Sequence, residues 1–388
     1  MTPRASLLNN PRARGLVFQA ALFASLALVF YLGVVNLSEK LARKPGLIDL
    51  GFWNQLAGFD INFSALPFAA GVSTYGQVFF VGLINTLIVS AIGIVLATLV
   101  GFTVGIARLS SNWLVAKLAT IYVEGLRNVP LLLQLLFWYN AVLKPLPLPK
   151  QSIEIYGGGA LNNRGLYLPA PIFAPGIWLV LLALLAAAAA SLGFYVWARR
   201  RQAATGAQAP VALVALGLLV MLPLAAFYLA GGPISFDYPR LKGFNLIGGL
   251  QLVPEFVALL LGLVLYTAAF IAEIVRAGIL SVSKGQSEAA AALGLRQGVV
   301  LRLVIVPQAL RVITPPLTSQ YLNLTKNSSL GSFIAFPELA HIFMGSTLNV
   351  TGAAIPIVAM TMAVYLVISL VTSGLMNIYN SRMALRER

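Results

Sequence analysis

The sequence predicts an all-α integral membrane protein with about eight transmembrane helices. Hydrophobic residues make up 59% of the chain and charged residues 10%, and the mean hydropathy is +0.88. Both values lie far from the averages of soluble domains. The apolar residues gather in runs of roughly 20, the length that crosses a bilayer as a helix. Bases are scattered between these runs, which is typical of membrane orientation signals rather than of a nucleic-acid-binding surface.

The candidate spans approach the length and composition that a transmembrane helix requires. They lie near residues 17–36, 79–107, 113–143, 176–197, 210–231, 253–277, 307–329 and 353–378. The first has no A-x-A cleavage site, so we interpret it as a retained span rather than a signal peptide. The fourth and fifth carry almost no polar side chains, and we interpret them as a hairpin inserted into a core.

The distribution of bases predicts the orientation. If the N-terminus is cytoplasmic, that side collects about twice as many lysines and arginines as the other side, which holds most of the acids. The positive-inside rule therefore predicts that both termini lie in the cytoplasm. It places two glycine- and proline-rich connections, 37–78 and 144–172, outside the membrane, and the segment that follows the sixth span inside.

That inner segment reads SKGQSEAAAALGLRQGVVLRLVIVPQALR, from Ser283 to Arg311. Ser283 and Gln286 form a capping-box pattern, the alanines favour a helix, and Gly294 is a natural stop, so we expect a helix of only two to three turns. Such a helix is marginal alone in water. Glu288 lies in its N-terminal half, where a carboxylate can pair with a partner's base. The segment is typical of a docking helix; a solvated linker is the alternative.

A wider pattern favours docking. Glu288, Ala289 and Ala290 are followed by Gly294, six residues after the glutamate, and by an apolar run that ends at Pro307. This pattern resembles the EAA loop of permease subunits of binding-protein-dependent ABC importers. Residues 122–139, 269–295 and 306–330 are similar to the polar amino-acid branch of that family. The extra first span and the inserted hairpin resemble the larger permeases of general L-amino-acid importers of Gram-negative bacteria.

The resemblance implies a bacterial inner-membrane subunit with a five-helix permease core, an extra N-terminal helix and an inserted helical hairpin. The chain would divide into an N-terminal helix with its periplasmic connection (1–78), a first core part (79–143), the inserted loops and hairpin (144–252) and a second core part (253–388) with the coupling loop 283–307. The ATPase-coupling residues would be Glu288, Ala289, Ala290, Gly294 and Pro307.

The resemblance also implies the partners: a second permease subunit, expected to be a paralogue, two ATPase subunits and a periplasmic amino-acid-binding protein. Together they would move L-amino acids from the periplasm to the cytoplasm. The chain has no G-x-x-x-x-G-K-[ST] phosphate loop, so the partner ATPase subunits would bind ATP and Mg. We expect neither a catalytic residue nor a cofactor in this chain; membrane lipid is a further expected partner, and nucleic acid is not.

Polar residues at membrane depth are candidates for the translocation pathway, because a charge there costs about 2.5 to 3.5 kcal/mol. We expect Glu124 to pair with Arg127, one helical turn away, and Glu273 with Arg276. A purely structural role and interhelical hydrogen bonding stay open as alternatives. The polar run near 320–329 is expected to be non-helical and to line a cavity. The candidates are Glu124, Arg127, Asn128, Gln134, Gln320, Asn323, Lys326, Asn327, Ser328 and Ser329.

Composition argues against other classes of protein. With no cysteine and a single histidine, His341, the chain offers no disulfide, thiol nucleophile or paired-histidine metal site. The acids are dispersed, whereas an integral-membrane enzyme would gather its reactive groups at one depth. A secondary amino-acid transporter remains the alternative function. It is expected to repeat its polar broken helix in two halves, and only one such segment is evident.

Overall fold

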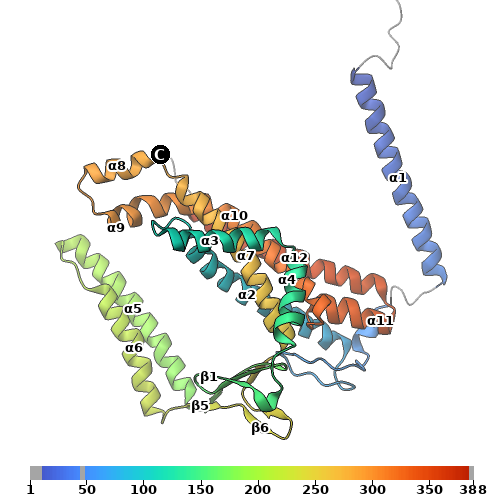
Figure 1. The fold of residues 1–388 in the computed structure, drawn as a ribbon, viewed down its shortest axis with the longest axis horizontal. Coiled ribbons are helices and arrows are strands. Elements are labelled where there is room, and N and C mark those ends of the chain that lie inside the picture. Colours follow the sequence, from blue (N-terminus) through green and yellow to red (C-terminus); the bar gives the residue numbers. More distant parts are fainter. Residues whose placement is uncertain (1–10, 44–48, 384–388) are drawn as a thin grey trace, which may run out of the picture. The chain divides into compact units, whose positions relative to one another are not determined.

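The computed structural model describes residues 11–43 and 49–383, and helices form most of this chain (Figure 1). Within the described residues, seven helical segments are long and apolar enough to cross a membrane: Arg14–Asn36, Tyr75–Ala107, Ile177–Thr205, Val211–Leu229, Pro254–Leu280, Gln297–Ile334 and Ala354–Ser381. The predicted helical membrane fold is therefore confirmed, although short strands also occur in the chain. The expected count of about eight differs by the segment 113–143.

The prediction of one continuous span over 113–143 was wrong. Helix α3 (Trp113–Asn128) ends just before Val129. Helical structure resumes as α4 (Leu131–Leu136) and continues as a π-helical stretch, η4 (Phe137–Leu143). Pro130 causes the break, because its ring pushes the residue before it out of helical geometry; Val129 is extended, with φ −100° and ψ 127°. The apolar helix that remains, Leu131–Leu143, is shorter than a full span.

The seventh span begins earlier than predicted. Helical structure runs from α9 (Gln297–Val300) through η6 (Leu301–Ile305) into α10 (Val306–Asn327) and η7 (Ser328–Ile334), rather than starting at Pro307. The turn η6 is π-helical, which accommodates the ring and the missing N–H of Pro307 just after it. The polar run up to Asn327 is thus regular helix, so the expectation that it is non-helical was wrong.

Two contact units divide the chain: Met1–Leu135 with Leu259–Arg388, and Leu136–Ala258. In the first, small residues bring α2 (Tyr75–Ala107) against α7 (Pro254–Leu280). A Cβ added at Gly101 would lie 2.6 Å from the Cβ of Ile271, and one at Gly105 would lie 2.8 Å from the Cβ of Val275. This G-x-x-x-G spacing lets the two helix backbones approach closely.

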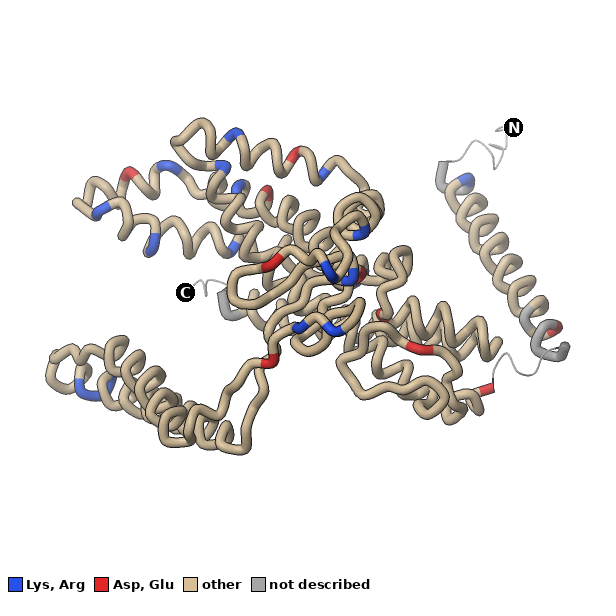
Figure 2. The backbone as a smooth tube through the Cα atoms, turned by 60° about the horizontal axis from the view of Figure 1, so that its bottom comes forward, with Lys and Arg blue, Asp and Glu red and all other residues tan. Residues whose placement is uncertain are grey.

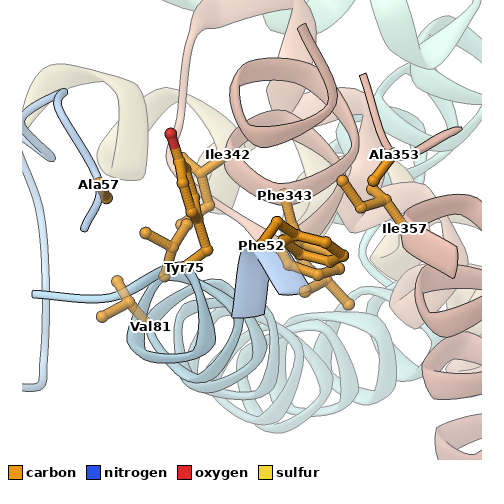
Figure 3. Close-up of a cluster of buried hydrophobic side chains, with 10 residues drawn as sticks. Phe52, Ala57, Tyr75, Val81, Ile342, Phe343, Ala353 and Ile357 are labelled. Carbon is orange, nitrogen blue, oxygen red and sulfur yellow. The ribbon is translucent and has the colours of Figure 1, made fainter. Parts of the chain in front are cut away.

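Aromatic residues form a second core of this unit (Figure 3). Phe52, in the short helix η3 (Gly51–Asn54), packs on Tyr75 and on Phe343 of the π-helical η8 (Ala340–Thr347), with ring centroids 6.4 and 6.2 Å apart. The connection 37–78 is therefore partly a packed element. The unit also contains α1 (Pro11–Arg43), α8 (Lys284–Ala292), α11 (Leu348–Thr351) and α12 (Ala354–Met383).

The second unit holds the predicted hairpin, α5 (Ile177–Thr205) and α6 (Val211–Leu229). The charged residues of the two hairpin helices, Arg199, Arg200 and Arg201, lie near the C-terminal end of α5, and Figure 2 shows bases at that end of the hairpin. The rest of the unit contains strands that the sequence analysis did not predict. An antiparallel sheet has the order β1 (Ile153–Ile155), β2 (Gly159–Asn162), β3 (Gly165–Leu168), β8 (Leu250–Leu252); β4 (Ala170–Phe173) pairs with β5 (Ile234–Asp237), and β6 (Arg240–Lys242) with β7 (Asn245–Ile247). A short helix, η5 (Pro149–Gln151), precedes β1.

Candidate functional site: a coupling segment and a polar helix face

The short helix after α7 has the predicted bounds but lacks the predicted N-terminal cap. Helix α8 begins after Ser283, whose side chain makes no capping hydrogen bond, so the expected capping box is absent. Instead, the carbonyl oxygen of Ser283 accepts the N–H of Gln286 at 3.0 Å. The side chain of Gln286 contacts Gln308 at the start of α10, with 3.4 Å between Oε1 and Nε2. Gln286 thus connects α8 to a membrane helix rather than capping α8.

The predicted stop at Gly294 is confirmed. Its φ is +73°, in the left-handed region, and two hydrogen bonds close the end of α8. Gly294 N–H donates to the carbonyl of Ala291 at 2.9 Å, and Leu295 N–H donates to that of Ala290 at 3.2 Å, the pattern of a Schellman motif. A Cβ at Gly294 would meet no atom within 4 Å. Backbone conformation alone therefore requires glycine here.

A hollow of about 700 Å³ opens between α8 and the turns that follow it. Ala290 on α8 and Val300 on α9 are both 6% exposed, and Val300 also lines the hollow. Glu288 lines the hollow, its side chain is exposed, and within the described residues no salt bridge engages it. The remaining lining residues are mostly apolar or small: Ser287, Ala291, Leu295, Gln297, Gly298, Val300, Leu301 and Ile305. The hollow therefore offers an apolar surface with a free carboxylate beside it.

Glu124 and Arg127 were expected to pair with one another, and this prediction was wrong. Glu124 lies 3.7 Å from the guanidinium of Arg108, at the end of α2, and Arg127 lies 3.8 Å from Glu273 on α7. Glu273 also pairs with Arg276 at 2.6 Å, as predicted, and with Arg108. Each α3 side chain thus finds its opposite charge on another helix, and the five residues form one cluster joining α2, α3 and α7.

This charge cluster is partly withdrawn from solvent. The side chain of Arg108 is 9% exposed and that of Glu273 is 26% exposed. Arg127 also lies over the ring of Phe270, 5.2 Å from its centroid. Because one carboxylate serves three guanidinium groups, the loss of Glu273 would leave several bases without compensation. The cluster is therefore a structural connection at the end of α7, the helix that leads into α8.

Asn128 and Gln134 lie on the two sides of the Pro130 break. The Nε2 of Gln134 donates to the carbonyls of Leu126 and Val129, both at 2.9 Å, and its side chain is 5% exposed. Gln134 thus satisfies carbonyls at the open end of α3. Asn128 donates to the backbone carbonyl of Glu124 at 2.8 Å, and its side chain remains exposed.

Polar side chains form an exposed face on α10. Asn323 and Lys326 are exposed, Gln320 and Asn327 are half-buried beside them, and no hydrogen bond joins any of these four side chains to another group within the described residues. Ser328 and Ser329 differ, because their hydroxyls donate to the backbone one turn earlier, at 2.7 and 2.8 Å. An apolar membrane helix with a polar face lacking partners indicates contact with water or another subunit.

Glu338, which was not among the residues predicted from the sequence, is fully buried. Its carboxylate accepts the N–H groups of Ala340 and His341 at 2.8 and 2.7 Å, and the hydroxyls of Ser332 and Tyr365 at 2.7 and 2.8 Å. It therefore caps η8 and joins it to α12. A proline and an acid directly before an apolar run, Pro337 and Glu338, are a helix-start signal that could have revealed it.

Residues 91–385 match the model of the family described as the binding-protein-dependent transport system inner membrane component. The chain belongs to this family. It is 48% identical over 98% of its length to YhdX of Escherichia coli (strain K12), a candidate amino-acid ABC transporter permease protein, and covers 96% of that protein. It is 48% identical over 99% of its length to the general L-amino acid transport system permease protein AapQ of Rhizobium johnstonii, covering 95% of it.

The name of a third relative specifies four amino acids. The chain is 40% identical over 98% of its length to the glutamate/glutamine/aspartate/asparagine transport system permease protein BztB of Rhodobacter capsulatus, and it covers 96% of that protein. All three matches include the residues outside the five-helix core. The resemblance inferred from the EAA segment is confirmed: this is a multi-pass inner-membrane permease subunit of the amino-acid ABC transporter type.

Proposed function

We propose that this chain forms one half of the membrane channel of an ATP-driven L-amino-acid importer, with α8 as the contact to an ATPase subunit. The coupling segment carries the proposal. Its short helix ends at Gly294, where the left-handed backbone favours glycine. The helix also presents Glu288 beside an apolar hollow. An exposed, short, alanine-rich helix with a free carboxylate suits the groove of a soluble partner subunit better than it suits a solvated linker.

The connections of α8 explain how movement would reach the membrane. The chain enters α8 three residues after α7 ends at Leu280, and it leaves through α9 and η6 directly into α10. A displacement of α8 would therefore act on two spanning helices. One of them, α7, is anchored to α2 and α3 by the charge cluster around Glu273; the other, α10, carries the polar face. ATP and Mg would be bound by the partner ATPase subunits.

We assign the translocation pathway to the polar face of α10. Lys326 supplies a positive charge for a carboxylate, and the amides of Asn323 and Asn327 supply donors and acceptors, a set that suits a zwitterionic amino acid. One helix face encloses no path, so a second permease must form the other wall. We expect a paralogue there, because an asymmetric pair lets one subunit alone carry the inserted unit. Native mass spectrometry that finds two copies of this chain in each complex would contradict the paralogue.

Both termini are assigned to the cytoplasm. The seven long spans of the described residues would by themselves leave the two ends on opposite sides, so this assignment requires the short helix Leu131–Leu143 to cross as well. Its 13 residues reach about 20 Å as a helix, less than the roughly 30 Å hydrocarbon core. It can cross only where other protein segments complete the path.

Substitutions in α8 test the coupling role. Glu288→Lys reverses the charge that a partner's base would meet, and Gly294→Val forces a β-branched residue to φ +73°. Both variants should enter the membrane and yet lose substrate-stimulated ATP hydrolysis in reconstituted vesicles. Gly294→Asn is the matched control, because asparagine tolerates the left-handed region and should retain most of the activity. Full transport by Glu288→Lys, with ATP hydrolysis still coupled to it, would reduce α8 to a linker.

A further inference from the structure

The unit Leu136–Ala258 contains a small β subdomain, which we define as residues 149–173 and 234–252 (Figure 1). Its buried core is small and includes Tyr167, Ala160 and Asn162, which are 3%, 8% and 1% exposed. Strand β3 pairs with β8, which follows the inserted hairpin in the sequence, with Leu166 opposite Leu252 and Leu168 opposite Leu250. The subdomain lies where α5 begins and α6 ends. Arg199–Arg201 lie at the other end of this hairpin. The outward surface of this subdomain has features that its own folding does not require.

One such feature is Tyr156, at the tip of the β1–β2 hairpin. Its side chain is fully exposed, at 106% of the reference area. The tip is nevertheless a defined structure: Gly157 and Gly158 have φ of +95° and +86°, and a Cβ on Gly158 would lie 2.6 Å from the ring of Tyr238. The glycines therefore let the hairpin tip close against Tyr238 while Tyr156 points away. A large aromatic side chain presented on a constrained turn is typical of a binding anchor.

A hollow of about 790 Å³ lies beside Tyr156. Its walls come from η5, the β1–β2 hairpin and the β6–β7 hairpin, and include Lys150, Glu154, Tyr156, Leu241 and Leu246. Phe244, at the turn between β6 and β7, is 77% exposed, and the Nζ of Lys150 lies 4.2 Å from its ring centroid. Two exposed aromatic rings thus belong to the hairpins that form the walls of one hollow, an arrangement unlike isolated surface hydrophobics.

The charges around the hollow favour an acidic partner. Lys150 is exposed on the wall of the hollow, and Arg240 and Lys242 are exposed on strand β6. Within the described residues, Arg240 is the one of these three that forms a salt bridge, with Asp237 at 3.6 Å. Glu154 is the single acid in the lining. These three bases exceed the two acids, Glu154 and Asp237, by one charge, so the surface favours a protein whose facing patch carries carboxylates, and the attraction raises the rate of encounter at low salt.

From these observations, and resting on the proposed importer function, we propose that the β subdomain docks the soluble amino-acid-binding protein, with Tyr156 and Phe244 as its anchors. The proposed orientation puts this subdomain on the periplasmic side, where that protein delivers its ligand, and away from the ATPase subunits. The partner's contact patch would be acidic at its rim, opposite Lys150 and Lys242, with apolar positions that receive the two rings. The inserted unit thereby gains a role in recruitment rather than in translocation.

The test uses the assembled complex in lipid vesicles and the purified periplasmic amino-acid-binding protein that stimulates ATP hydrolysis by the unmodified complex. Tyr156→Ala and Phe244→Ala should each raise the half-saturating concentration of that protein about tenfold, while the rate at saturation is retained. The matched control is Phe236→Ala, because Phe236 is 53% exposed in the same subdomain but lies on strand β5, outside the hairpins that form the walls of the hollow. This control should shift the concentration less than twofold. Lys150→Glu should raise it too, most strongly at low salt.

The outcomes separate the inference from the function on which it rests. If no binding protein stimulates the unmodified complex, the proposed function fails. If stimulation is normal and both aromatic variants stay within twofold of the unmodified complex, the docking surface is wrong while the function stands. A loss of the second permease subunit from the variant complexes would assign the surface to subunit pairing, and this too would overturn the proposal.

Discussion

Replacing Glu273 with glutamine tests the charge cluster at the end of α7. The substitution keeps the shape of the side chain and removes the negative charge that Arg108, Arg127 and Arg276 share. Removing one partner of a buried ion pair costs about 3 to 5 kcal/mol. Glu273 is 26% exposed and Glu124 still lies 3.7 Å from Arg108, so solvent and the second carboxylate reduce the effect. We therefore expect a loss of about 2 to 3 kcal/mol of stability.

Thermal unfolding of the complex in detergent measures this loss. At about 2 to 4 °C for each kcal/mol, the transition of Glu273→Gln should fall by about 4 to 12 °C. Arg240→Gln provides the control, because it breaks an ion pair to Asp237 in which the arginine side chain is 79% exposed, and such pairs contribute little. A double-mutant cycle with Arg108→Gln should yield a coupling energy above about 1 kcal/mol. Equal transitions for Glu273→Gln and Arg240→Gln would refute the reasoning.

Two further predictions concern helix packing and topology. Gly105→Ala should lower the thermal transition, because the added Cβ meets Ala272 and Val275 at 2.8 Å, whereas Gly193→Ala on α5, with nothing within 4 Å, should leave it unchanged or raise it. A normal transition for Gly105→Ala would show that α2 and α7 are not in close contact. Reporter fusions after Arg201 and Arg311 should read cytoplasmic, and fusions near Asp60, Arg164 and Lys242 periplasmic. A periplasmic signal at Arg311 would contradict the orientation and the coupling role of α8 together.

The sequence predicted those parts of the fold whose signal is local. Long apolar runs predict spans because each helix satisfies its own backbone, and Gly294 predicts the end of α8 because a left-handed stop depends on few neighbours. Pro130 lay within the expected third span, and its effect on Val129 was the available sign of a break. Hydropathy alone predicts one span there, because an apolar average does not register a single proline.

Other parts depend on contacts between distant segments, which periodicity does not contain. Strands of three or four residues carry little pattern, and β3 finds its partner β8 only after the inserted hairpin. Glu124 lies one turn from Arg127, yet Glu124 pairs with Arg108 at the end of α2. Arg127 pairs with Glu273 on α7. Pro337 and Glu338 signal a helix start, which accounts for the backbone N–H groups that Glu338 accepts, but nothing in the sequence indicates the hydroxyls of Ser332 and Tyr365 that tertiary structure brings to its carboxylate.

The measurement that bears most directly on the central proposal is uptake of radiolabelled L-amino acids into vesicles that contain the assembled complex. ATP is enclosed in the vesicles at the side of α8, and the binding protein is added outside. We predict accumulation that requires both ATP and the binding protein and that Glu288→Lys abolishes. Accumulation at the unmodified rate without ATP, driven by an ion gradient alone, would contradict the proposal and identify a secondary transporter instead.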